Sequence, residues 1–256
     1  MINSVRALAL ATYKENIRDR IMLALVVFCL LLLGSTVFLG SISLDQDSKI
    51  IIDFGLFGIF FFGVIITLFV SGSTIAKELD QRTAYTVLAR PIKRSWFIAG
   101  KFSGIAMTLA TLTASMALVF FVLLAIRLNI HDIDLSLILA IIYLYLELLV
   151  LAALLLLFSS FTSSVLSVIY GFAVLLIGHS TPTIVALIRD TESIFRYIFL
   201  AIYYIFPNFE KFNLRNDAVY HLTPNPLEVF LVFGYATAFI VLFLYLAGLT
   251  LQKTEL

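Results

Sequence analysis

The sequence predicts an all-α integral membrane protein with six membrane-crossing helices. Of its 256 residues, 62% are hydrophobic and 13% are charged, and the mean hydropathy is +1.08. Soluble domains are about 45–50% apolar and about 25% charged, so a water-soluble fold of this length could not cover so much apolar surface. Two further observations support this class: several apolar stretches are long enough to cross a bilayer, and the basic residues are unevenly distributed along the chain.

The first element, residues 2–20, is predicted to be an amphipathic helix that lies in the plane of the membrane. Its apolar side carries Ile2, Val5, Ala9, Tyr13 and Ile17, which are spaced three to four residues apart. Charged residues occupy the other side, as in helices with one buried face. Its basic residues and its position before a long apolar run are typical of a helix in the headgroup region. The alternative is an ordinary polar cytoplasmic tail.

Six stretches are predicted to cross the membrane as one transmembrane domain over residues 1–256. A helix needs about 20 residues to cross the hydrocarbon core. The stretches that satisfy this requirement are 21–39, 54–76, 102–126, 137–158, 165–188 and 229–251. Because this number is even, both termini are expected on the same side.

The distribution of charge predicts which side that is. The N-terminal segment, residues 77–101 and the C-terminal tail together hold 11 of the 17 Lys and Arg residues but only 5 of the 16 Asp and Glu residues. Positively charged loops remain in the cytoplasm. Both termini and residues 77–101 are therefore expected to be cytoplasmic, in a cell membrane that would be the inner membrane in a bacterium.

The longest segment on the predicted outer side is 189–228. Its first part, residues 194–206, is rich in Ile, Phe and Tyr but too short to cross the membrane, and a polar stretch follows Pro207. Aromatic residues favour the headgroup boundary. We interpret this extracytoplasmic segment as one or two interfacial or re-entrant helices. Pro182 is expected to kink or end the fifth predicted span, because proline removes a helical hydrogen bond.

No catalytic motif is present in the sequence. There is no H-E-x-x-H, no G-x-S-x-G, no zinc-type Cys/His spacing and no Walker A loop, since Gly100-Lys101 is followed by Phe102. The chain is therefore not expected to be an enzyme or to hold a cofactor. His131, Asp132 and Asp134 are candidate metal ligands, but three polar residues in a short loop are more often solvated, so no metal site is predicted.

Two features inside the predicted spans are candidates for a transport path or a helix interface. Glu147 is ionisable, and a charge at the centre of a span costs about 2.5–3.5 kcal/mol on insertion scales, so it should face protein or water. Small and hydroxyl residues also recur along one face of the third span, at Gly100, Gly104, Thr108, Thr111 and Ser115. Such faces allow close helix packing. Packing and a path both remain open for each feature.

Residues 77–101 are the most informative segment. Thr83 can cap a short helix with Val87 and Leu88 on its apolar side, and Pro91 would end that helix before the basic residues that follow. An apolar helix face in the cytoplasm requires a partner. The alternative is a loop whose Lys and Arg residues bind anionic lipid.

This segment resembles the first cytoplasmic loop of type-2 ABC-transporter permeases. The family pattern is a glutamate at the end of the second span, a threonine soon after, a leucine, a proline with a following basic residue, and Gly-Lys at the start of the third span. The corresponding residues here are Glu78, Thr83, Leu88, Pro91, Arg94, Gly100 and Lys101. Arg82 stands where many members have glycine. The sequence Pro207-Asn208-Phe209-Glu210 is similar to a stretch in permeases grouped with multicopper-enzyme maturation.

The resemblance implies a membrane subunit of an ATP-driven exporter. A separate cytoplasmic ATP-binding-cassette ATPase would bind ATP and Mg, and this chain would hold no cofactor. The ATPase would dock on a coupling helix that includes Glu78, Thr83, Val87, Leu88, Pro91 and Arg94. A second permease chain, identical or paralogous, would complete the transporter. No nucleic-acid partner is implied.

Two other functions are consistent with parts of the sequence. One is an ion-coupled secondary carrier that uses Glu147, although such carriers usually contain inverted repeats, which are not evident here. The other is a membrane scaffold that recruits a cytoplasmic partner without transporting anything. The sequence does not identify the substrate.

Overall fold

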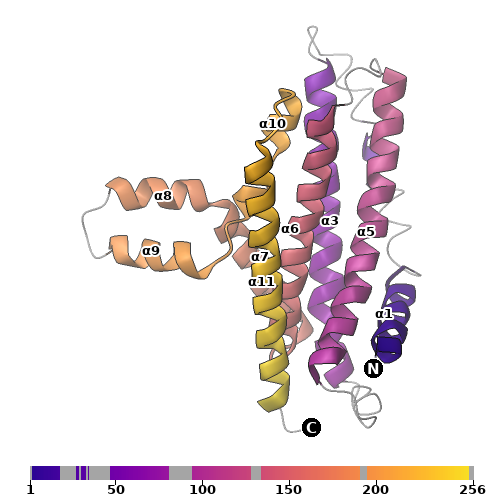
Figure 1. Ribbon diagram of the computed structural model, residues 1–256, viewed down its shortest axis with the longest axis vertical. Coiled ribbons are helices and arrows are strands. Elements are labelled where there is room, and N and C mark those ends of the chain that lie inside the picture. Colours follow the sequence, from indigo (N-terminus) through magenta and orange to yellow (C-terminus); the bar gives the residue numbers. More distant parts are fainter. Residues whose placement is uncertain are drawn as a thin grey trace.

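The computed structural model describes residues 2–17, 27–28, 30–32, 34, 47–80, 94–127, 134–190 and 195–253. Every regular element in these ranges is a helix. Four helices are long and apolar enough to cross a membrane: α3 (Asp47–Asp80), α5 (Arg94–Arg127), α6 (Leu135–Ser159) and α11 (Pro226–Lys253). They run side by side along the long axis of the molecule (Figure 1). The class of all-helical integral membrane protein is therefore confirmed, whereas the count of six spans stays a prediction.

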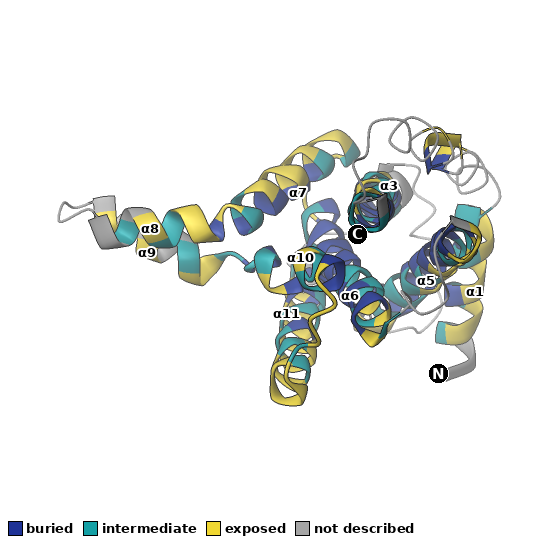
Figure 2. Cartoon of the chain, turned by 90° about the horizontal axis from the view of Figure 1, so that it is seen from above, coloured by how far each residue is buried: buried dark blue, intermediate teal, exposed yellow. Residues whose placement is uncertain are grey.

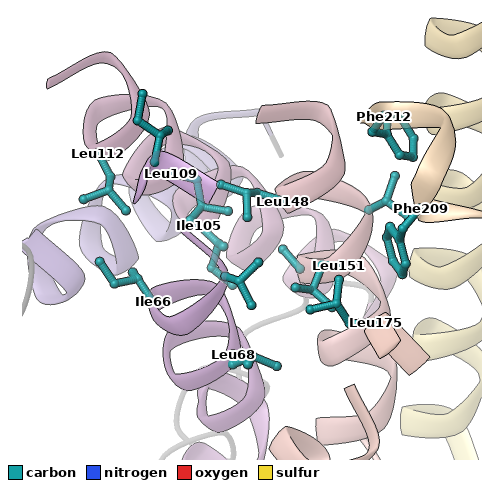
Figure 3. Close-up of a cluster of buried hydrophobic side chains, with 14 of the residues drawn as sticks. Ile66, Leu68, Ile105, Leu109, Leu112, Leu148, Leu151, Leu175, Phe209 and Phe212 are labelled. Atoms are coloured by element: carbon teal, nitrogen blue, oxygen red, sulfur yellow. The ribbon is translucent and has the colours of Figure 1, made fainter. Parts of the chain in front are cut away.

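Helix α6 lies at the centre of the bundle. It contacts α3, α5 and α11, and also α7 (Ser164–His179), which is joined to it by a tight turn. Leucines of α6 such as Leu148 and Leu151 lie between Ile105 and Leu109 of α5 on one side and Leu175 of α7 on the other (Figure 3). Each of these side chains is almost fully buried, so apolar packing around α6 forms the core.

The fifth predicted span, residues 165–188, is divided into two helices. Helix α7 ends at His179, Ser180 forms a turn, and α8 (Thr181–Asp190) begins next to Pro182. This break lies where the proline was expected to interrupt the span. The 16 residues of α7 cover about 24 Å, which is less than the roughly 30 Å of the hydrocarbon core. Helix α7 alone is therefore shorter than a full crossing.

Helices α8, α9 (Phe195–Ile205), η3 (Phe209–Phe212) and α10 (Arg215–Val219) lie between the break and the last long helix. Helices α8 and α9 pack against each other and project sideways from the bundle (Figure 1). A short 3-10 helix, η3, and α10 then return the chain to α3 and α6. The segment predicted as interfacial or re-entrant thus contains α9, η3 and α10, and its position in a membrane stays a prediction.

The N-terminal helix α1 (Ile2–Asn16) packs on the small-residue face of the third predicted span, which belongs to α5. Tyr13 Oη lies 3.1 Å from Thr111 Oγ1, and Asn16 Nδ2 donates to Thr108 Oγ1 over 3.4 Å. A Cβ atom added at Gly104 would come within 2.7 Å of the Ala9 carbonyl oxygen. In this structure the face predicted as either a packing surface or a path is therefore covered by α1 along part of its length.

The first predicted span, residues 21–39, lies mostly outside the described residues. Two of its described side chains, Phe28 and Leu32, are buried in the core, and the Phe28 ring meets Phe62 of α3 edge-on, with centroids 5.9 Å apart. This part of the chain therefore contributes to the core beside α3.

Helix α11 is the least enclosed of the four long helices. Only 11% of its most apolar 18-residue stretch is buried within the molecule, compared with 44–56% of the corresponding stretches of α3, α5 and α6. Figure 2 shows that most of its surface is exposed. Its outward face therefore has no packing partner in the described part of the chain.

Gly104→Ala is expected to weaken the packing of α1 on α5. The new methyl group would lie 2.6 Å from Thr12 Cβ, and such overpacking typically costs about 1–3 kcal/mol. Gly248→Ala is the matched control, because a Cβ at Gly248 meets nothing within 4 Å and alanine has the higher helix propensity. Thermal unfolding in detergent should show a lower Tm for Gly104→Ala alone. Equal Tm values for the two variants would contradict the close α1–α5 contact.

Candidate functional site

Glu147 meets two other ionisable side chains that come from distant parts of the sequence. His179 Nε2 lies 2.8 Å from Glu147 Oε1, and His179 Nδ1 lies 3.2 Å from Glu210 Oε2. Glu147 belongs to α6, His179 is the last residue of α7, and Glu210 belongs to η3. The imidazole therefore connects a buried carboxylate in the bundle with a partly exposed carboxylate in the segment that covers it.

The end of α7 places His179 in this position. The proline at the second position of α8 has no N–H for a helical hydrogen bond, and Thr181 Oγ1 instead donates to the Gly178 carbonyl oxygen over 2.6 Å. Pro207 and Phe209 pack directly on Gly178, where an added Cβ would lie 2.4 Å from a Phe209 ring carbon and 2.6 Å from the Pro207 carbonyl oxygen. Only glycine at residue 178 allows η3 to approach this closely.

Glu210 is held by the residues on either side of it. Phe209 and Phe212 are fully buried and anchor η3 against α6 and α7. The Asn208 backbone N–H donates to Tyr235 Oη of α11 over 2.7 Å, and Asn213 Nδ2 donates to Glu210 Oε1 over 2.9 Å. These contacts fix the second carboxylate of the group.

Aromatic rings enclose the imidazole of His179. The Phe60 ring of α3 meets it edge-on with centroids 5.4 Å apart, and the Phe209 ring stacks on it with centroids 6.1 Å apart. These rings cover part of the imidazole and reduce its contact with water, which strengthens the electrostatic contacts between the imidazole and its two carboxylates.

A cavity of about 180 Å³ adjoins this group. Its lining residues come from α3, α6, the end of α7, the connection between η3 and α10, and the first residue of α10: Leu56, Phe57, Phe60, Ala140, Leu144, Glu147, His179, Asn213, Leu214 and Arg215. Arg215 Nε lies 2.8 Å from Asp53 Oδ1 of α3, but the N–H is not directed at that oxygen, so the contact is an ion pair without a hydrogen bond. The walls are mostly apolar, with charged groups at a few defined points.

The arrangement does not favour a metal site. Each nitrogen of His179 already faces a carboxylate oxygen, so neither nitrogen is open to a metal ion. No group of three or more His, Cys, Asp or Glu residues that could hold a metal is present in the described ranges. Of the outer-loop candidates, His131 and Asp132 lie outside the described residues, and Asp134 Oδ2 lies 2.9 Å from His221 Nδ1.

What the group can do chemically is hold and relay protons. The ring donates to both carboxylates only when both nitrogens are protonated, and in its neutral form one nitrogen requires a proton from a neighbouring carboxyl group. Proton transfer within the group leaves its net charge unchanged but alters the hydrogen bonds, whereas uptake or release of a proton changes both the net charge and the hydrogen bonds.

The structure places the other predicted site residues away from this group. Thr108 and Thr111 contact α1, and Ser115 Oγ donates to the Leu112 carbonyl oxygen of its own helix. The predicted coupling residues Thr83, Val87, Leu88 and Pro91 lie outside the described residues. Glu78 belongs to the last turn of α3 and Arg94 begins α5, and the side chains of both also lie outside the description.

Sequence reasoning identified Glu147 but not its partners. His179 and Glu210 are 32 and 63 residues away from Glu147 along the chain, near Pro182 and Pro207 respectively, and no regular spacing connects either of them to Glu147. A signal was nevertheless present, because a histidine at the end of an apolar run requires a polar partner. The same reasoning applied to both Glu147 and His179 would have suggested that they pair.

The long apolar helices define the chain as a multi-pass membrane protein. The chain matches the family model of ABC-2 family transporter proteins over residues 6–256, and it therefore belongs to this family. It is an ABC-2 permease, which is a membrane transport subunit and not itself catalytic. No match was found among curated proteins.

Glu147→Gln and His179→Gln are expected to be coupled in their effects on stability. Removing one partner of a buried charged pair typically costs about 3–5 kcal/mol, because it leaves the other unpaired. The double variant should then lose less unfolding free energy than the two single variants lose together, and the difference, the coupling energy, should be about 1–3 kcal/mol. Denaturant unfolding in detergent measures all three, and exposed Glu228→Gln is the control. Additive losses would show that the two side chains do not interact.

Proposed function

We propose that this chain is the membrane-spanning subunit of an ATP-driven exporter. A separate cytoplasmic ATPase would bind ATP and Mg, and two permease chains, identical or paralogous, would form the membrane part. The family match over residues 6–256 is the observation that carries this proposal. The exposed outward face of α11 leaves room for a second permease chain or for lipid.

The lengths of α3 and α5 support a coupling role for residues 77–101. Each helix has 34 residues and is about 51 Å long, well beyond the roughly 30 Å of the hydrocarbon core. The end of α3 and the start of α5 lie at the same end of the bundle as the C-terminal end of α11 (Figure 1). This is the end that the charge distribution assigns to the cytoplasm.

The ATPase would dock on this segment through the coupling helix, with Val87 and Leu88 as apolar anchors and Glu78 and Arg94 as polar ones. Anchors at the centre of an interface dominate its affinity, whereas charges at its rim contribute little. Thr83 and Pro91 would set the start and the end of the helix.

A second candidate function is proton-coupled secondary transport. The Glu147–His179–Glu210 group favours it, because chains of buried carboxylates and histidines conduct protons in such carriers. Reconstitution in proteoliposomes separates the two functions. An exporter requires ATP and its ATPase subunit, whereas a carrier responds to an imposed pH gradient in the absence of both.

Leu88→Asp is expected to release the ATPase or to uncouple its hydrolysis from transport. Truncating an apolar interface anchor commonly costs about 2 kcal/mol or more of binding free energy, which is roughly thirtyfold in affinity. Lys93→Ala should have almost no effect if the segment docks an ATPase. If the segment instead binds anionic lipid through its basic residues, the substitution should weaken its attachment to the membrane surface. Co-purification with the cognate ATPase and transport-coupled hydrolysis measure both variants. A normal complex with normal coupling in Leu88→Asp would show that this segment is not the coupling helix.

Cysteine labelling tests the orientation on which this model depends. Cysteines substituted at Asn213 and Asn129 should react with an impermeant reagent from outside the cell, and a cysteine at Gln81 should not, because the basic segments are assigned to the cytoplasm. Labelling from outside of the cysteine that replaces Gln81 would overturn both the orientation and the docking model.

A further inference from the structure

The charges around the cavity do not balance. When the carboxyl groups of Glu147 and Glu210 are both ionised, even a doubly protonated His179 ring leaves one negative charge uncompensated. The other cation that lines the cavity, Arg215, is already paired with the carboxylate of Asp53. Charge in a poorly solvated site is costly unless it is paired. One further positive charge beside Glu147 would make the whole group neutral.

Glu147 offers a free acceptor for that charge. Its side chain is 1% exposed and lines the cavity, and Oε1 contacts His179. No side chain or backbone group in the described part of the chain donates a hydrogen bond to the second oxygen, Oε2. Both oxygens of Glu210 are engaged, one by His179 and the other by Asn213. A carboxylate oxygen can accept more than one hydrogen bond, so Glu147 remains open to a ligand.

The remaining walls fit an apolar body attached to the positive charge. Phe57 and Phe60 of α3 and Leu56 and Leu144 line the cavity. Aromatic faces attract cations, and the Arg215 guanidinium already lies 5.6 Å from the centroid of the Phe57 ring. A volume of about 180 Å³ compares with apolar cavities of about 150 Å³ that admit a benzene-sized molecule.

We propose that this cavity binds a small organic ammonium, with its N–H groups on Glu147 and its apolar body against Phe57 and Phe60. The ligand is a soluble amine or the ammonium of a lipid headgroup, since both present the same chemistry. The proposal concerns binding alone and does not depend on the ATPase. It goes beyond the proposed export function by naming a ligand class for this site.

The cavity suits an organic cation better than an inorganic one. Hard cations need several oxygen ligands to replace their hydration shell. Of the four polar lining residues, His179 and Arg215 are already paired with carboxylates, so the oxygen ligands that the cavity offers come from Glu147 and Asn213. An ammonium needs fewer acceptors, and its carbon substituents gain from apolar contact.

The test compares benzylamine with benzyl alcohol, which has nearly the same shape without the charge. Binding to the purified chain in detergent is measured by calorimetry and by ligand-detected NMR. Benzylamine should bind at least about tenfold more tightly than benzyl alcohol, and Glu147→Gln should remove that advantage. Glu228→Gln, which removes an exposed carboxylate from the first turn of α11, should leave both affinities unchanged.

A second variant keeps the test decisive if Glu147→Gln does not fold. Ala140→Leu narrows the cavity without changing its charge, because Ala140 lines it and is 2% exposed. This variant should lower the affinity for both benzylamine and benzyl alcohol by at least about tenfold. Equal binding of the two probes, retention of benzylamine binding in Glu147→Gln, or unchanged binding in Ala140→Leu would each overturn the proposal.

Lipid composition identifies the source of the ammonium. In nanodiscs that contain phosphatidylethanolamine, a headgroup ligand would compete with benzylamine and weaken its binding relative to nanodiscs of phosphatidylglycerol. Equal binding in the two nanodiscs would identify a soluble amine as the ligand. Benzylamine binding is also measured with NaCl and with a salt of a bulkier cation at the same ionic strength. Displacement of benzylamine by Na⁺ alone would show that the cavity binds an inorganic cation and would overturn the proposal.

Discussion

The burial of a carboxylate on the central helix constrains much of the surrounding structure. Glu147 lies among the leucines of α6, and an unpaired charge there would be costly. His179 is the partner, and it can reach Glu147 only from the end of α7 beside the break in the chain. The interruption of the fifth apolar segment and the pairing of the buried acid are therefore two aspects of one arrangement.

The same pairing ties the outer segment to the bundle. Glu210 extends the contact from His179 into η3, and the two buried phenylalanines on either side of it make that attachment apolar as well. Two contacts hold the residues that follow: an ion pair between Arg215 and Asp53 of α3, and a 2.9 Å approach of His221 Nδ1 to Asp134 Oδ2 before α6. His221 adopts a positive φ of 56°, so the backbone turns sharply where it makes this contact. The buried phenylalanines thus anchor the outer segment over the cavity, and these partly exposed polar contacts add to its orientation.

Hydrophobicity along the chain was sufficient to predict the fold class and the approximate position of the long helices. It predicted α6 and α11 to within about three residues at each end, because their apolar runs and their helices nearly coincide. It placed the start of the third span at residue 102, whereas α5 begins at Arg94, since a helix that continues into water no longer has an apolar signal. The partners of Glu147 were not predictable in this way. The Glu147–His179 and His179–Glu210 contacts, across 32 and 31 residues, depend on how α7 ends and on how η3 packs against it.

Helix α3 links the two ends of the molecule that matter for the proposed function. Its last turn adjoins the coupling segment, while Asp53, Phe57 and Phe60 near its first turns hold Arg215 and line the cavity. Between these points it is one continuous helix of 34 residues without a proline, so its ends cannot move independently without breaking hydrogen bonds or packing. A displacement of the coupling segment by a docked ATPase would therefore also displace the aromatic wall of the cavity. The backbone of α3 would therefore transmit movement directly from the coupling segment to the cavity. Transmission through side-chain contacts would instead require a chain of many separate contacts over the same distance.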